Sequence, residues 1–181
     1  YKCVGDGTRY MSELAVGEEL DILVGLGNGF WSVAEERVVL VGGGVGVPPL
    51  YGLARRLMAE GKSVSVVLGF NTAAEIFLQE KFEALGARVV VATMDGSAGV
   101  KGTVIDAIRG EAIEYDYFYS CGPLPMLRAL CEQSSGEGQV SLEERMGCGF
   151  GICMGCTHET HSGHKRICKE GPVLLKSDVV W

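Results

Sequence analysis

The sequence predicts an α/β fold built on a doubly wound, mostly parallel sheet. Between Arg37 and Leu130, short β-branched runs alternate with stretches whose apolar residues recur at helical spacing, and the connections are short. A glycine-rich turn follows the first of these runs, and a cluster of cysteines follows the whole alternating segment. The 181 residues suffice for one compact domain with a small additional module.

The alternating segment divides into eight expected elements. Strands are expected where β-branched and aromatic residues dominate, at 37–41, 63–68, 87–92 and 115–120. Helices are expected in the stretches between and after these strands, at 48–60, 73–85, 102–109 and 123–131. The last of these helices begins with proline, which is tolerated in the first helical turn.

The composition changes on both sides of this segment. Residues 1–34 indicate turns and short strands punctuated by glycine, a length too small for a complete domain. Residues 134–138 are typical of a linker, and a cysteine-rich module follows them. We therefore expect three parts, at 1–34, 35–138 and 139–181. The chain opens without a methionine, in sequence typical of the middle of a domain, so we expect a longer parent protein.

Charge and cysteine content narrow the function classes. Sixteen basic and 23 acidic residues give a net charge of −7, which argues against a nucleic-acid-binding protein, because such proteins need a basic surface. No apolar run reaches the roughly 20 residues of a membrane helix. The seven cysteines are odd in number and clustered, which indicates metal ligation in a reducing compartment. We expect a cytoplasmic protein with neither a nucleic-acid nor a membrane partner.

The turn after the first strand has the composition of a phosphate-binding loop. Its residues include Gly42, Gly43, Gly44, Val45, Gly46 and Pro48. Glycines let the backbone approach a pyrophosphate, and the start of the following helix stabilises its negative charge. Pro49 stands where the common dinucleotide fingerprint has a third glycine. We predict a dinucleotide site here, and the alternative is a tight turn that merely tolerates glycine.

Two further segments bear on this site. Residues 69–75 contain no Arg or Lys to hold a ribose 2′-phosphate, which favours NAD over NADP, although no acidic residue closes the second strand at 68–71. A second loop follows the strand at 115–120 and would reach the same sheet edge; it contains Cys121, Gly122, Pro123 and Met126. Taken alone, this loop is explained by an ordinary helix start.

Four cysteines have the spacing of an iron-sulfur site. Cys148, Cys153 and Cys156 follow a Cys-x4-Cys-x2-Cys pattern, and Cys168 comes after eleven more residues. This is the plant-type ferredoxin spacing for a [2Fe-2S] cluster, and the interspersed glycines suit backbone amides that must approach the sulfurs. The alternative is a structural zinc site, which more often joins two short knuckles than one compact loop and a later strand.

The remaining metal-binding residue types are not expected to be ligands. His158, His161 and His164 lie between the third and fourth cysteines and are expected on the surface of a hairpin, because four thiolates complete the set. Cys3 and Cys131 are expected to be ordinary small apolar residues, and Cys121 has no clear role.

The combination resembles the electron transfer subunits of dihydroorotate dehydrogenase. The resemblance covers essentially the whole chain, and the motifs that carry it lie at 42–48, 121–126, 143–156 and 166–173. It implies a ferredoxin-reductase-like flavoprotein. In such a protein 1–34 is the remnant of an FAD-binding β-barrel, 35–138 the NAD-binding domain and 139–181 the [2Fe-2S] domain.

The resemblance also implies site residues. Tyr1 and Lys2 match the flavin side of the FAD site, and Gly7 and Thr8 match its phosphate contact. The two glycine-containing loops match the NAD site, with Gly42, Gly43, Gly44, Val45, Gly46, Pro48, Cys121, Gly122, Pro123 and Met126. The cluster ligands are Cys148, Cys153, Cys156 and Cys168, and no catalytic acid or base is expected. The family's upstream Arg-Pro-x-Ser flavin motif is absent.

The implied function is electron relay in pyrimidine biosynthesis. A partner subunit oxidises dihydroorotate on FMN, and electrons pass through the [2Fe-2S] cluster and FAD to NAD⁺, with a heterotetramer as the expected assembly. One alternative is a sister flavoprotein that couples NAD(P)H to ferredoxin. Another is a non-catalytic, zinc-stabilised interaction module on a nucleotide-binding sheet. Residues 173–175 and Trp181 are candidates for the subunit interface, with ordinary packing as the simpler explanation of each.

Overall fold

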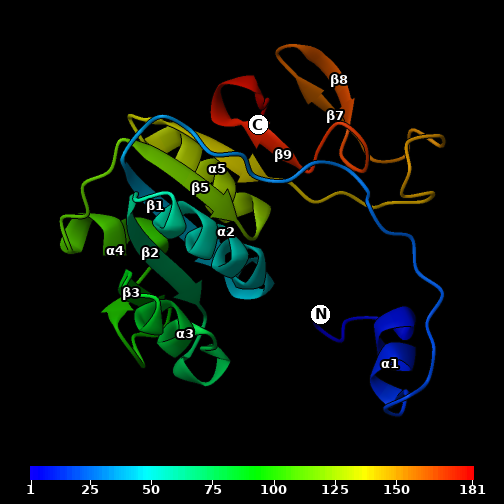
Figure 1. Ribbon diagram of the computed structural model, residues 1–181, viewed down its shortest axis with the longest axis horizontal. Coiled ribbons are helices and arrows are strands. Elements are labelled where there is room, and N and C mark those ends of the chain that lie inside the picture. Colours follow the sequence, from blue (N-terminus) through cyan, green and yellow to red (C-terminus); the bar gives the residue numbers. More distant parts are fainter.

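A seven-stranded sheet forms the centre of the computed structural model, which describes residues 1–181 (Figure 1). Its strands lie in the order β4-β3-β2-β1-β5-β6-β9. Their bounds are β1 Arg37–Gly43, β2 Ser63–Phe70, β3 Arg88–Thr93, β4 Val100–Lys101, β5 Tyr117–Cys121, β6 Glu137–Ser141 and β9 Val173–Leu175. Every neighbouring pair is parallel except β6 and β9. The predicted doubly wound, mostly parallel sheet is confirmed.

Helices cover both faces of this sheet. The helix bounds are α2 Val47–Ala59, α3 Gln79–Ala84, α4 Val104–Gly110 and α5 Leu124–Gln133. Residues of α2 and α3 share one buried cluster with Val38 and Leu40, whereas residues of α4 and α5 share the other with Val39 and Val41. Alternate residues of β1 thus enter opposite cores, which explains why the strand is continuously apolar rather than amphipathic.

The predicted helix at 73–85 is wrong as a single element. The chain forms a 3₁₀ turn at Ala73–Glu75 and then α3, and Leu78 between them has a φ of 63°. Phe77 lies outside both helices and packs edge to face on Phe70 at the end of β2, with ring centroids 5.6 Å apart. This contact and the left-handed residue interrupt the helical spacing that the apolar residues suggest.

Two predictions about the flanking segments are also wrong. Residues 1–34 contain the helix α1 (Asp6–Glu13) and no strand, and α1 lies apart from the sheet (Figure 1). The expected linker at 134–138 overlaps β6, so the predicted boundary at 138 falls inside a strand. The glycine that suggested a linker is a packing requirement, because a Cβ at Gly138 would lie 2.4 Å from the Phe118 ring.

The cysteine-rich module is continuous with the main sheet. It contains the expected hairpin, formed by β7 (Thr157–Thr160) and β8 (Gly163–Arg166), and then returns to the sheet as β9, antiparallel to β6. Cys156, Ile167 and Cys168 belong to the same buried cluster as residues of α4 and α5. Val173 and Leu174 are buried in this arrangement, so packing accounts for most of the apolar segment at 173–175.

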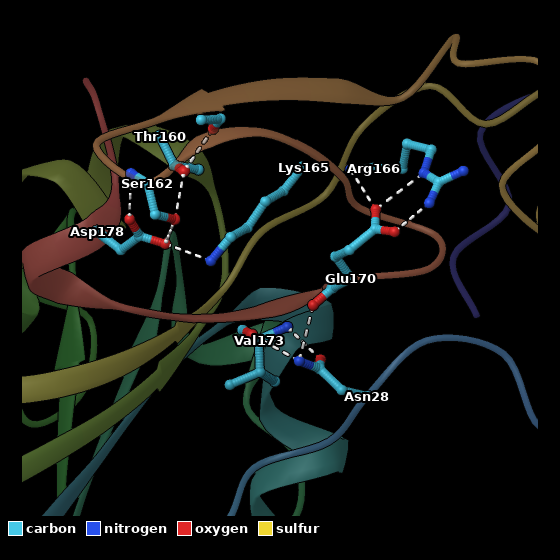
Figure 2. Close-up of polar contacts among 9 residues, drawn as sticks. Asn28, Thr160, Ser162, Lys165, Arg166, Glu170, Val173 and Asp178 are labelled. Atoms are coloured by element: carbon cyan, nitrogen blue, oxygen red, sulfur yellow. Dashed lines mark hydrogen bonds and ion pairs between the residues drawn. The ribbon is translucent and has the colours of Figure 1, made fainter.

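The segment 28–31, which we call the strap, joins the N-terminal part of the chain to the main sheet and to the cysteine-rich module. The Asn28 side-chain amide donates to the carbonyls of Glu170 (3.0 Å) and Val173 (2.9 Å) and accepts from the Val173 amide (2.8 Å) (Figure 2). The backbone N–H of Trp31 donates to Gln139 Oε1 at 3.0 Å, and Gln139 Nε2 donates to the Trp31 carbonyl at 3.0 Å. The strap therefore bridges β6 and the turn after the fourth cysteine.

The hairpin is fixed independently at its other end. Asp178 accepts hydrogen bonds from the backbone and hydroxyl of Ser162, each at 2.9 Å, and from Lys165 (Figure 2). Asp178 ends the short 3₁₀ turn Lys176–Asp178 that follows β9. The C-terminal segment and the strap thus hold the module from two sides.

We predict that Gln139→Leu lowers the free energy of unfolding by about 1 to 3 kcal/mol, because a partly buried Trp31 amide loses its acceptor. Urea unfolding followed by circular dichroism measures this change. Gln79→Leu is the control: the Gln79 side chain bonds to Glu83 in an exposed position, so its effect should stay within about 0.5 kcal/mol. Equal effects of the two substitutions would contradict the role given to Gln139.

Candidate functional site

The two predicted nucleotide-binding loops lie side by side. The strand order reverses at β1, whose neighbours are β2 and β5, and Gly42 stands opposite Cys121 in the parallel register. The loops that leave the carboxyl ends of these strands border a cavity of about 1070 Å³. This is the topological switch point at which open α/β sheets bind their ligands.

Most, but not all, of the predicted nucleotide residues line this cavity. The lining residues among them are Gly43, Gly44, Val45, Gly46, Cys121, Gly122, Pro123 and Met126. Gly42 does not line it: a Cβ there would lie 3.0 Å from side-chain atoms of Val47 and Leu50, so its role is to let α2 pack on the sheet. Pro48 also lies outside the lining, in the first turn of the helix.

Glycine is required where the two loops touch each other. A Cβ at Gly46 would lie 2.2 Å from the carbonyl oxygen of Cys121, and one at Gly122 would lie 3.0 Å from the backbone nitrogen of Gly43. A Cβ at Gly43 would lie 2.7 Å from Met126 and 2.9 Å from Pro123. Packing thus accounts for three glycines. Gly44 has a φ of 51° with open space beside it, so it lets the loop turn towards the cavity.

The start of α2 leaves room for an anion. The N-cap is Gly46, no side chain caps the helix, and no acidic residue lies in its first turn. Pro48 and Pro49 have no N–H, so backbone donors to a phosphate must come from the loop that precedes the helix. Loop amides next to a helix N-terminus fit a pyrophosphate.

An acidic residue that the sequence analysis missed lies at the far end of the cavity. Glu75 Oε2 accepts hydrogen bonds from the backbone (3.1 Å) and side-chain (3.0 Å) nitrogens of Asn71. Glu75, Asn71 and Phe77 all line the cavity. The 3₁₀ turn brings Glu75 back to the end of β2. The single helix expected at 73–85 did not indicate this position. A carboxylate there suits a ribose hydroxyl and repels a 2′-phosphate.

A second missed segment joins the nucleotide cavity to the cysteines. Ser141, Leu142, Glu143 and Met146 line the cavity, and the first cysteine of the motif follows two residues later. Cys121 faces this segment, and burial raises the pKa of its thiol while the Ser141 hydroxyl opposes that rise. The two predicted sites are thus separated by one short piece of chain.

The residues predicted for FAD are only partly brought together. Lys2 lines the cavity, whereas Tyr1, Gly7 and Thr8 do not, and Tyr1 is exposed. Thr8 Oγ1 accepts hydrogen bonds from the amides of Val4 (2.9 Å) and Gly5 (3.1 Å), which caps the start of α1. Gly7 and Thr8 therefore lie in the first turn of a helix, where backbone amides suit a phosphate.

The cysteine loop surrounds its sulfurs with backbone amides. Cys148 Sγ accepts from the amides of Ile152 (3.3 Å) and Cys153 (3.4 Å), and Cys153 Sγ accepts from those of Cys148 (3.5 Å) and Gly155 (3.4 Å). Amide donors from Cys153, Phe150 and Ile152 lower the pKa of Cys148 to about 6. These donors favour the thiolate, which is the form that binds a metal.

The four predicted ligands lie in two pairs. Cys148 contacts Cys153, and Cys156 Sγ accepts from the Cys168 amide at 3.4 Å. No three Cys, His, Asp or Glu side chains converge on one point. A [2Fe-2S] cluster has two irons, each needing two protein ligands, and two pairs of thiols match that requirement.

The structure confirms some of the other predictions about the cysteine-rich module and contradicts others. Cys168 lies in the turn after β8 rather than in a strand. His161 and His164 are exposed on the hairpin as expected, whereas His158 is half-buried and its Nδ1 lies 3.2 Å from Glu144 Oε1. Cys131 is a buried core residue, but Cys3 is exposed.

Apolar side chains project around the cysteine loop. Met146, Phe150, Ile152 and Met154 are all exposed, Ile152 by 74%. We call these four residues the apolar rim. Large apolar groups gathered on a surface are typical of an interaction site. No helix of the protein has the length and apolarity needed to cross a bilayer.

Family comparisons match both halves of the site. Residues 143–180 match the iron-sulfur cluster binding domain of dihydroorotate dehydrogenase B, and residues 40–132 match the oxidoreductase NAD-binding domain. Relatives from Geobacillus kaustophilus and Fusobacterium nucleatum are 45% and 42% identical. Each is called the electron transfer subunit of dihydroorotate dehydrogenase B (NAD(+)), and each match covers 99% of this chain and 72% of the relative.

Solved structures match the fold. The NADH-dependent reduced ferredoxin-NADP oxidoreductase superposes with a TM-score of 0.86 at 32% identity, covering 100% of this chain and 67% of that one. The cytochrome b5 reductase domain of Ulva prolifera nitrate reductase gives 0.54 at 19% identity, covering 68% of this chain and 56% of that one. The predicted ferredoxin-reductase-like fold is confirmed.

Gly46→Ala is expected to weaken NADH binding by tenfold or more, about 1.4 kcal/mol, because the added methyl forces the two loops apart. Fluorescence titration with NADH measures this, and circular dichroism checks the fold. Gly52→Ala is the matched control, since that helical glycine has open space around its Cβ position. Unchanged affinity in a folded Gly46→Ala protein would show that the loop contact does not shape the site.

Proposed function

Because this chain belongs to the family of electron transfer subunits of dihydroorotate dehydrogenase B, we propose that it passes electrons from a dihydroorotate-oxidising subunit to NAD⁺ in pyrimidine biosynthesis. One structural observation carries the proposal. The segment 141–146 lines the nucleotide cavity and leads directly into the cysteine loop. Two redox sites in one chain, joined by six residues, suit electron relay.

The cofactors are a [2Fe-2S] cluster, FAD and NAD, which supply one-electron transfer, conversion between one- and two-electron steps, and hydride acceptance, respectively. In the proposal Cys148, Cys153, Cys156 and Cys168 hold the cluster. The glycine loop from Gly43 to Gly46 and the loop from Cys121 to Met126 hold NAD. Tyr1, Lys2, Gly7 and Thr8 serve FAD. We assign no residue of this chain as a proton donor or acceptor, because positioning is the protein's contribution.

In the proposal these residues position the cofactors and shield them from water, and none of them takes part in a chemical step. The loop amides near Gly44 and Gly46 meet the pyrophosphate, and Glu75 at the far end selects NAD by its negative charge. Cys156 and Cys168 are buried, which keeps water from that side of the cluster site. The subunit belongs in the reducing cytoplasm in this proposal, because its four thiols must stay reduced to bind iron.

We assign the partner's docking site to the apolar rim. The partner in the proposal is the FMN-containing catalytic subunit, in a heterotetramer with two copies of each chain. The rim surrounds the pair Cys148 and Cys153, the more exposed half of the cluster site. A partner seated there would exclude water and bring its own redox group close to the exposed thiols.

The ferredoxin-coupled alternative has an observation in its favour, the TM-score of 0.86 to the ferredoxin-NADP oxidoreductase. The decisive experiment uses the full-length subunit, expressed without oxygen together with the catalytic subunit from the same source. We expect NADH to form on addition of dihydroorotate only when both subunits are present. If the subunits do not associate and NAD(P)H instead reduces ferredoxin, the alternative is correct.

Cys153→Ser is expected to abolish cluster binding while the sheet stays folded, because the loss of one ligand leaves an iron incompletely held. Iron, labile sulfide and zinc analysis of anaerobically purified protein measures this. Cys3→Ser is the control, since Cys3 is an exposed thiol outside the motif. Unchanged iron in Cys153→Ser would refute the ligand assignment, and zinc in place of iron in the parent protein would refute the [2Fe-2S] cluster.

Ile152→Asp is expected to weaken association with the catalytic subunit by tenfold or more, because a charge replaces an apolar contact that must be desolvated. Analytical ultracentrifugation of the purified pair measures the affinity. Val16→Asp is the control, because Val16 is fully exposed in the N-terminal segment. The same small effect from both substitutions would place the interface elsewhere.

A further inference from the structure

One peptide unit connects a cluster thiol to an arginine. Arg166 Nη1 donates to the carbonyl oxygen of Gly151 at 2.6 Å, and the N–H of Ile152, in the same peptide, donates to Cys148 Sγ at 3.3 Å. The C=O and N–H of a trans peptide point in opposite directions. A donor that fixes this carbonyl therefore aims the N–H at the sulfur.

The position of Gly151 makes this contact possible. Its φ is 88°, in the left-handed region, and it lies buried between the first and second cysteines of the motif. A Cβ there would lie 2.6 Å from the Lys169 side chain and 3.4 Å from the Arg166 guanidinium. Only glycine lets the loop approach the turn that carries the fourth cysteine.

The guanidinium is itself held in place by Glu170. Glu170 Oε2 accepts from Arg166 Nε (2.9 Å) and from the Arg166 backbone N–H (2.8 Å), and Oε1 accepts from Nη2 (Figure 2). The two-pronged contact fixes the plane of the guanidinium. The Glu170 carbonyl accepts from Asn28 of the strap at 3.0 Å, so the carboxylate stands on an anchored turn.

We propose that Arg166, oriented by Glu170, raises the reduction potential of the cluster by holding the Gly151–Ile152 peptide in the orientation that donates to Cys148. The inference rests on the proposed cysteine ligands. Reduction adds negative charge, and hydrogen bonds to the sulfurs set the potential by stabilising that charge. A hydrogen bond accepted at the carbonyl polarises the peptide and strengthens its N–H as a donor. Arg166 is thus a positioning residue.

The charge of Arg166 is a rival explanation, because the guanidinium also lies near the thiols of Cys156 and Cys168. Two variants separate charge from orientation. Arg166→Gln combined with Glu170→Gln removes one positive and one negative charge, so the net charge is unchanged while the carbonyl loses its oriented donor. Arg166→Lys keeps the positive charge but loses the planar fork.

The experiment is a redox titration followed by electron paramagnetic resonance, on the full-length subunit in complex with its catalytic partner. We expect a more negative cluster potential in both variants, with two irons retained and the flavin potential unchanged. The control replaces Arg128 and Glu132 by glutamine. That pair has the same four-residue spacing on α5, with Nε and Oε1 2.8 Å apart, and should leave the potential unaltered.

The outcomes are distinct. An unchanged potential in the double variant would overturn the inference, because the oriented donor would then be lost without effect. A fall in the double variant with Arg166→Lys unchanged would also overturn it, because any cation at position 166 would then serve and the oriented guanidinium would not be needed. Loss of iron from both variants would also overturn it, because the pair would then retain the cluster rather than tune it. A parent protein without iron and sulfide would instead refute the proposed function.

Discussion

The contact between the loops after β1 and β5 is the constraint on which the site depends. The Gly46 backbone lies against the Cys121 carbonyl with no room for a side chain. This approach follows from the parallel pairing of β1 with β5 at the point where the strand order reverses. It holds the start of α2 against the loop that follows β5, and residues of both loops line the cavity. A wider turn at Gly46 would separate the two loops.

The cysteine module depends on the same sheet. It has no separate core, because its strand β9 pairs with β6 and its buried residues join the cluster beneath α4 and α5. The strap adds polar contacts at two points, from Asn28 to Glu170 in the turn after Cys168 and from Trp31 to Gln139. Side-chain amides suit this role because each can both donate and accept hydrogen bonds. One such side chain can therefore bond to backbone groups of two different segments. The nucleotide cavity and the cluster site are therefore held in one frame.

Local patterns in the sequence were sufficient for the central strands β1, β2, β3 and β5, whereas β4, β6 and β9 were not predicted. Strands such as β1 are buried on two faces and are therefore continuously apolar. The predictions from sequence fail where contacts between residues far apart in the chain determine the local structure. Gly138 suggests a linker, but the Phe118 ring lies where its Cβ would be. The helix predicted at 73–85 is interrupted between the 3₁₀ turn and α3, where Phe77 packs on Phe70. Glu75 was missed for the same reason. Its place in the cavity depends on that break.

The proposed cluster site is asymmetric, and the asymmetry has a physical origin. Cys156 and Cys168 lie in the core, whereas Cys148 and Cys153 lie in a loop without regular structure, beneath the apolar rim. The buried pair is fixed by packing, so the exposed pair must be fixed by hydrogen bonds, and most of the amide donors to sulfur serve it. The hydrogen bond from Arg166 to the Gly151 carbonyl is one of the polar contacts that support the exposed pair. Rigidity on the exposed side thus comes from polar contacts within the chain, which leaves the apolar groups of the loop available to a partner.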